Sequence, residues 1–180
     1  MRIVPAILSS LAAASAVALA GATPAAAAPA DFQVISANGP LTVYNPALVP
    51  AGSRAHVIAL SAMGTTTVLS VHGLLPNHEY GAHAHAKACG ATGDAAGPHF
   101  QHNPDPVTPS VDPAYANPRN EVWLDFTTDR LGTGIAVSRV DWTFGERRAK
   151  SIVIHETHTH TDPGHAGSAG ARLACLNVGF

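Results

Sequence analysis

Residues 80–89 read YGAHAHAKAC and carry the strongest structural signal in the chain. In a β-strand the side chains of residues i and i+2 point to the same face, so His83 and His85 would lie side by side and could bind one ion. The neighbouring glycine and alanines leave room for a metal. A His-x-His pair alone is more often an exposed pair on a strand, so the rest of the chain has to support this interpretation.

Outside this segment, several short runs are rich in β-branched residues or alternate between apolar and polar residues. The runs are 54–63 (RAHVIALSAM), 66–72 (TTVLSVH), 121–128 (EVWLDFTT), 134–144 (GIAVSRVDWTF) and 150–155 (KSIVIH). Each run is bounded by Gly, Pro, Asn or Asp, and no stretch has the period of a long helix. Many short strands separated by turns predict an all-β domain, either a sandwich or a barrel.

Two long segments interrupt this pattern. Residues 87–120 hold six prolines, and residues 156–172 are rich in Thr, His, Gly and Ala. Irregular loops of this length in a compact domain are usually functional or disordered. Because both segments carry histidines and each leads to a cysteine, we expect two functional loops.

The first 30 residues have the pattern of a secretory signal peptide. Arg2 is the one charged residue before Asp31, and the intervening run is apolar and ends in AAAAPA at 25–30. We expect cleavage within this tract, after Ala30, leaving one domain over residues 31–180. A membrane anchor fits less well, because Pro and Gly interrupt a short apolar run. The mature protein should be secreted, or retained in a periplasm or cell wall, with no membrane span.

Charge and cysteines narrow the function classes further. The formal net charge is −2 and no basic stripe is present, which argues against nucleic acid as a partner. Cys89 and Cys175 both lie in the exported part, where two cysteines indicate first a disulfide. Two thiolate metal ligands are the alternative, but neither cysteine has a Cys or His partner at zinc-motif spacing except on the His83 side.

Four motifs in this order resemble the Cu,Zn superoxide dismutase family. GAHAHAKAC is similar to the family's copper-binding strand, GPHF to the segment with its bridging histidine, and IVIHE to the strand with its last copper ligand. GSAGARLAC is similar to the C-terminal segment with an arginine and the second cysteine. The resemblance covers about residues 34–180 and implies a Greek-key β-barrel or sandwich of about eight strands.

The resemblance also implies roles for individual residues. The copper ligands would be His83, His85, His99 and His155. Arg172 would draw in superoxide and His99 would carry a proton to the forming peroxide, so these two are the candidate catalytic residues. Cys89 and Cys175 match the family's disulfide. The implied reaction converts superoxide to oxygen and hydrogen peroxide by one-electron copper cycling, for which imidazole ligands are suited.

The expected zinc site is missing. In the zinc-containing family the loop after the bridging histidine supplies two more histidines and an aspartate. Here residues 101–126 contain a single histidine, His102. Arg119 lies where ligands are expected, and a cation there opposes zinc. The chain therefore resembles the copper-only branch, in which a carboxylate could hold His99. Glu121 is the first candidate and Asp125 the second, although either could simply be a surface charge or cap.

Alternatives stay open for the zinc site, for the second loop and for the function. Zinc could bind a rebuilt site drawn from His102, Asp105, Asp112, His158, His160 and His165, although their spacing matches no known motif. The histidines of the second loop could also belong to an exposed flexible loop, or capture copper during loading. In function, the alternative to an enzyme is a non-enzymatic extracytoplasmic copper-binding or copper-carrier protein. The sequence leaves open whether the chain is a monomer or a homodimer.

Overall fold

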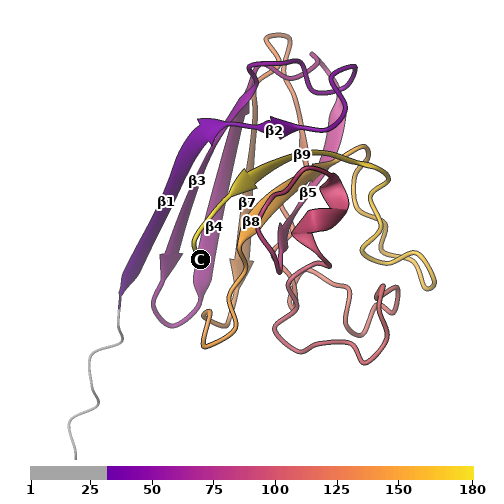
Figure 1. Ribbon diagram of the computed structural model, residues 1–180. Helices are drawn as coiled ribbons and strands as arrows, with labels where there is room; N and C mark the ends of the chain where they lie inside the picture. The colour runs from indigo at the N-terminus through magenta and orange to yellow at the C-terminus, as the bar shows by residue number, and fades with distance from the viewer. Residues whose placement is uncertain (1–31) are drawn as a thin grey trace, which may run out of the picture.

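The computed structural model describes residues 32–180, so the expected signal peptide lies outside the described residues. Over this range the chain forms nine strands in two antiparallel sheets and one short 3-10 helix (Figure 1). The two sheets pack as a sandwich, which confirms the predicted all-β fold with two long loops. Among residues 32–180 no helix has the length and hydropathy needed to cross a bilayer.

The first sheet has four strands in the order β1-β3-β4-β7. Their bounds are β1 Gln33–Pro40, β3 Arg54–Ser61, β4 Thr65–His72 and β7 Gly134–Val140. Val57 pairs with Leu69, and Leu69 with Ala136, so these three buried side chains form one row across the sheet. This row faces the core because alternate residues of a strand point to the same side.

The second sheet has five strands in the order β2-β9-β8-β5-β6. Their bounds are β2 Thr42–Val43, β5 Glu79–His85, β6 Phe126–Thr127, β8 Ser151–His155 and β9 Arg172–Asn177. On β5, Ala82 and Ala84 belong to the core, so His83 and His85 point to the other face of the sheet. Their side chains are nevertheless fully buried, because the loops cover this outer face.

The two long loops lie against that outer face of the second sheet (Figure 1). The first loop includes the 3-10 helix η1, Gly93–Ala96, which packs against β9 and β8. Cys89 and Cys175 form a disulfide with their Cα atoms 5.8 Å apart, and it joins this loop to β9. The sequence therefore builds a sandwich with one sheet face covered by loops, and the histidines lie under that cover.

Two predicted strands are shorter than expected. In the run 121–128 only Phe126–Thr127 form a strand, because Glu121 and Trp123 pair through isolated bridges to Gln101 and His83. In the run 134–144 the strand ends at Val140. Beyond that point the buried aromatic rings of Trp142 and Phe144 pack edge to face, 5.3 Å apart, and close one end of the core.

Alternation in the sequence does not reveal β1 and β9. The eight residues of β1 (QVISANGP) include Asn, Gly and Pro, and most of their side chains are exposed or half-buried. In β9 (RLACLN) four consecutive residues are buried, because β9 contacts the core on one face and the disulfide region on the other. A strand buried on both faces has no polar alternation to detect.

Candidate metal centre

Four histidine side chains meet on the covered face of the second sheet. His83 and His85 come from β5, His155 ends β8, and His99 comes from the first long loop. Each offers one nitrogen, and the four ligand atoms lie within 4.8 Å of one another. Among residues 32–180 this is the only group of three or more histidine, cysteine or acidic side chains that could hold a metal ion.

The hydrogen bonds of His83 determine which of its nitrogens is free. Nε2 lies 2.7 Å from Oγ1 of Thr159, and this hydroxyl donates to Oδ1 of Asp125 at 2.7 Å. Because the hydroxyl proton is used on the carboxylate, the hydroxyl oxygen accepts the Nε2–H proton of His83. The other nitrogen, Nδ1, is buried and has no hydrogen-bond partner among the described residues. A buried unpaired nitrogen aimed into a histidine cluster fits a metal ligand.

His85 is oriented in a comparable way. Its Nδ1 lies 2.9 Å from the carbonyl oxygen of Gly97, which can only accept, so Nδ1 carries the proton. Nε2 is left with a lone pair, and it lies 3.3 Å from Nε2 of His155. A hydrogen bond from the ring nitrogen that does not bind the metal fixes the tautomer of a metal-ligating histidine. These two nitrogens are therefore placed to share one ion.

Burial keeps three of these histidines, His83, His85 and His155, neutral. Desolvation, together with the neighbouring histidines, holds the pKa values of His83 and His85 well below the usual value. Desolvation, with repulsion from His99, lowers the pKa of His155 to about 3. A neutral imidazole has the lone pair that a metal requires, so these three side chains are ready as ligands at physiological pH.

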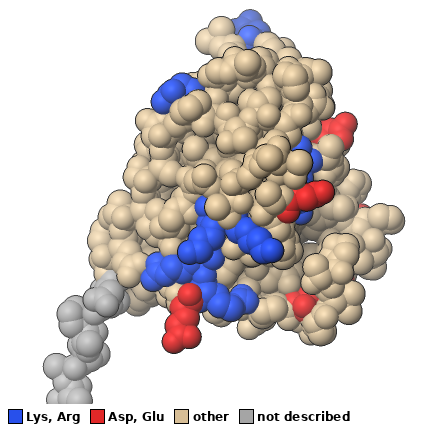
Figure 2. Space-filling model, viewed as in Figure 1, with Lys and Arg blue, Asp and Glu red and all other residues tan. Residues whose placement is uncertain are grey.

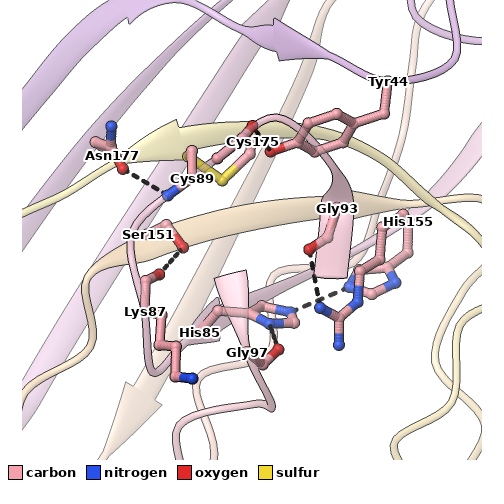
Figure 3. Close-up of a disulfide and its surroundings, with 12 residues drawn as sticks. Tyr44, His85, Lys87, Cys89, Gly93, Gly97, Ser151, His155, Cys175 and Asn177 are labelled. Carbon is pink, nitrogen blue, oxygen red and sulfur yellow. Dashed lines mark hydrogen bonds between the residues drawn. A yellow bond between two sulfur atoms is a disulfide. The ribbon is translucent and has the colours of Figure 1, made fainter. Parts of the chain in front are cut away.

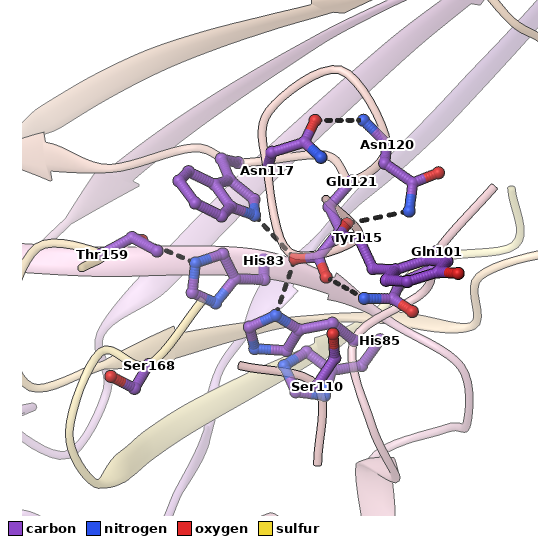
Figure 4. A network of polar contacts seen from close by, with 12 residues as sticks. His83, His85, Gln101, Ser110, Tyr115, Asn117, Asn120, Glu121, Thr159 and Ser168 are labelled. Carbon is purple, nitrogen blue, oxygen red and sulfur yellow. Dashed lines mark hydrogen bonds and ion pairs between the residues drawn. The ribbon is translucent and has the colours of Figure 1, made fainter. Parts of the chain in front are cut away.

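His99 is held by the buried carboxylate of Glu121, which Figure 4 shows bonded to Gln101. Its Nδ1 donates to Oε2 of Glu121 at 2.8 Å. Glu121 is 1% exposed and accepts two more hydrogen bonds, from Nε1 of Trp123 at 2.6 Å and from Nε2 of Gln101 at 2.8 Å. Three donors fix this carboxylate, and His99 keeps Nε2 for the metal.

Asp125 has a different place from Glu121. Its carboxylate accepts from the backbone N–H and the hydroxyl of Thr159, each at 2.7 Å. Oδ1 lies 3.9 Å from Nε2 of His83, so Asp125 acts on that histidine through Thr159. Thr159 therefore ties the second long loop to a candidate ligand.

Arg172 lies at the edge of the same site and is positioned by the disulfide loop, whose Cys89 and Gly93 are labelled in Figure 3. Its Nη1 donates to the carbonyl oxygen of Gly93 at 2.9 Å. A Cβ at Gly93 would lie 2.6 Å from Cβ of Arg172, so the close approach needs glycine. Burial lowers the pKa of the Arg172 guanidinium below its usual value, but a guanidinium remains charged at physiological pH. Arg172 and His155 line one cavity.

The structure does not gather the six residues considered for a rebuilt zinc site: His102, Asp105, Asp112, His158, His160 and His165. His102 stacks on Trp142 with ring centroids 4.9 Å apart. The carboxylates of Asp105 and Asp112 accept backbone N–H groups of their own turns. These three residues therefore have structural partners of their own.

The histidines of the second loop lie apart from the four-histidine group. Nε2 of His158 donates to the carbonyl oxygen of Phe126 at 3.1 Å. His160 and His165 lie on either side of Asp162, exposed, with ring centroids 6.3 Å apart. Within the described chain none of them joins the four-histidine group.

Sequence reasoning did not identify Thr159, Gln101 or Trp123 as parts of the site. Trp123 follows Glu121 by two residues, so a shared face of an extended segment was the available signal. Gln101 follows His99 by two residues in the same way. Thr159 gave no signal, because its contact with His83 spans 76 positions of sequence.

No protein-family model and no curated protein matches the chain. Among solved structures, the fold is similar to a Cu/Zn superoxide dismutase from Brucella abortus, with a TM-score of 0.58 and 17% identity. That match covers 83% of this chain and 100% of the other. A double mutant of a SOD-like protein from Bacillus subtilis matches with a TM-score of 0.53 and 16% identity, covering 80% of this chain and 94% of the other. At these identities the likeness shows a shared fold.

Proposed function

We propose that this protein is an exported, copper-dependent superoxide dismutase that lacks the family's zinc site. The observation that carries the proposal is the hydrogen bond from Nδ1 of His99 to the buried Glu121. It places a carboxylate on the ring nitrogen that would face zinc in the zinc-containing family. The fold shared with the Cu/Zn superoxide dismutase from Brucella abortus supports the dismutase part of the proposal.

The donor set fits copper. Four imidazoles with their ligand atoms within 4.8 Å of one another suit both oxidation states of this metal, and three of the rings are kept neutral by burial. When bound, copper would supply the one-electron chemistry by which one superoxide is oxidised to oxygen and a second is reduced to peroxide. The holding residues would be His83, His85, His99 and His155. Zinc has no comparable donor set among residues 32–180.

The remaining steps belong to the protein's own residues. The guanidinium of Arg172 attracts the anion to the site and donates hydrogen bonds to it. When Nε2 of His99 is not a metal ligand it would take up a proton and transfer it to the forming peroxide, while Glu121 keeps the ring oriented through Nδ1. Two superoxide anions and two protons give one oxygen and one hydrogen peroxide, so the charge and atoms balance.

An extracytoplasmic location accompanies this function. The Cys89–Cys175 disulfide is expected of a protein folded in an oxidising compartment, such as a periplasm, a cell wall or the exterior. Expression of the full chain followed by N-terminal sequencing of the exported product tests this proposal. A mature start near residue 31 supports it, and retention of residues 1–30 in the cytoplasm contradicts it.

Metal content and catalysis separate an enzyme from a copper carrier. The proposal predicts that His83→Ala loses copper and activity together, since it removes a ligand. Arg172→Ala should keep the copper and lose rate, because the guanidinium acts on the substrate rather than on the metal. A copper-loaded wild-type protein without dismutase activity would favour the carrier.

A further inference from the structure

The cavity beside the candidate metal centre is much larger than superoxide requires. Its volume is about 670 Å³, within the range of about 300–1,000 Å³ found for small-molecule sites. A diatomic anion needs a volume of the order of one water, ~30 Å³. Its lining includes His99 and His155 together with residues of the segments 104–111 and 146–150.

One wall of the cavity is apolar. It is lined by Phe100, Pro104, Val107, Pro109 and Val111. Val107 is 64% exposed and Val111 is 38% exposed. Exposed apolar side chains that gather in a hollow, rather than singly on a surface, indicate a binding site.

This wall is held in place before any ligand arrives. The carboxylate of Asp105 accepts the backbone N–H of Val107 at 2.8 Å and the hydroxyl of Ser110 at 2.6 Å. The second long loop also holds the wall, because the N–H of Gly164 donates to the carbonyl oxygen of Val111 at 3.1 Å. A preformed wall lowers the cost of ordering on binding.

Another part of the lining is cationic. It consists of Arg147, Arg148 and Lys150, and Arg172 also lines the cavity. The guanidinium of Arg147 lies over the Phe100 ring, 5.1 Å from its centroid. Figure 2 shows Lys and Arg side chains gathered on the face where the chain enters β8. Within the described chain, the three side chains of residues 147–150 make no ion pair.

The lining carries four cationic side chains against three carboxylates, so an excess of one positive charge remains. Glu121 is bonded to His99, Trp123 and Gln101, and Asp105 is occupied by its own turn. Glu146 is exposed at the rim and is the one carboxylate of the lining without such a role. Charge complementarity therefore favours an anion with an apolar body.

We propose that this cavity is a binding site for an amphipathic organic anion, an aryl or alkyl carboxylate or sulfonate. The apolar body would lie against Val107 and Val111. The anionic group would face Arg148 and Lys150. This site lies beyond the dismutase function and does not require metal, so it can be tested on the metal-free protein.

Titration of the purified disulfide-bonded protein with 8-anilinonaphthalene-1-sulfonate tests the proposal, with fluorescence as the readout. N-phenyl-1-naphthylamine is the matched uncharged probe. We expect saturable binding of the sulfonate and a Kd about tenfold higher in the double variant Arg148→Ala, Lys150→Ala, as for loss of a charge-assisted contact. The uncharged probe should bind more weakly and be indifferent to this change. Val107→Asp should weaken both probes.

Arg130→Ala is the matched control, since it removes an exposed cation from the turn between β6 and β7. It should leave the Kd unchanged, and urea midpoints should show that every variant compared is equally folded. Three results would overturn the proposal: no saturable binding by the wild type, an unchanged Kd in the double variant, or equal affinity for the charged and uncharged probes.

Discussion

Oε2 of Glu121 accepts the Nδ1–H of His99 at 2.8 Å, and the same carboxylate accepts from Trp123 and Gln101. Glu121→Gln leaves one acceptor oxygen for three donors and sets an amide N–H₂ against a donor. Loss of a hydrogen bond to a charged group costs about 1.5–3 kcal/mol. We therefore expect activity per bound copper to fall about 10- to 100-fold, measured beside copper content.

Glu79→Gln is the control for this change, because it removes an exposed carboxylate that belongs neither to the His99 network nor to the cavity lining. Full activity per copper in Glu121→Gln would show that the carboxylate does not position the ring.

Thr159 joins His83 to Asp125, so its hydroxyl should fix the His83 tautomer. Thr159→Val keeps the shape and removes the hydroxyl. It should weaken copper binding about tenfold, as for loss of an outer hydrogen bond at a metal site, and change the electron paramagnetic resonance spectrum of Cu(II). Thr159→Ser should restore both. If Thr159→Val and the wild type have equal spectra and equal copper affinities, the hydroxyl does not fix the His83 tautomer.

Arg172 lies beside the histidines and carries a fixed positive charge. Arg172→Ala should retain copper and lose about tenfold or more in rate, and its rate should depend less on ionic strength, because steering is electrostatic. Arg130→Ala removes the same charge far from the cavity lining and should leave the salt dependence as it is. A rate and salt profile unchanged in Arg172→Ala would contradict the guiding role.

The disulfide closes a long loop, since Cys89 and Cys175 are 86 positions apart. The chain-entropy model gives about 4–5 kcal/mol for a loop of this length. Replacement of both cysteines by serine should lower the free energy of unfolding by up to that amount, measured by urea denaturation. The Gly93 carbonyl that holds Arg172 lies in this loop, so activity should fall under conditions where the variant is still folded. If the variant with both cysteines replaced keeps wild-type activity, Arg172 does not need the disulfide to hold it in place.

The depressed pKa of His155, about 3, links stability to pH. In an unfolded chain a histidine titrates near 6.5, so between pH 6.5 and 3 the unfolded state binds a proton that the folded state does not. Stability of the metal-free protein should therefore fall as pH decreases through this window, by up to about 1.4 kcal/mol per pH unit for each such histidine. His83 and His85 shift in the same direction. Urea midpoints at pH 7 and pH 5 measure the effect, and equal midpoints would contradict it.

The fold was largely predictable because its signals are local. In β4 the buried Leu69 and Val71 lie on either side of the less buried Ser70, and the sequence shows that period directly. The run 121–128 shows where this reasoning fails. Val122, Leu124 and Phe126 are buried in alternation, but the backbone makes only isolated bridges before β6. The period of apolar side chains predicts which residues are buried. It does not predict whether the backbone pairing between two strands is continuous.

The site divides in the same way. The His83–His85 pair and His155 are strand residues, so motif and period identify them together. Thr159 could not be found, because its contact with His83 exists only once the second loop folds over β5. The cavity between residues 104–111 and 146–150 also depends on tertiary packing, and the sequence contains no sign of it.

The most direct test is the metal content of the copper- and zinc-reconstituted protein, measured together with its superoxide dismutase activity. We expect one copper per chain, no zinc and high activity. One copper with one zinc would contradict a zinc-free site in which Glu121 holds His99. Copper without activity would contradict the proposed dismutase function.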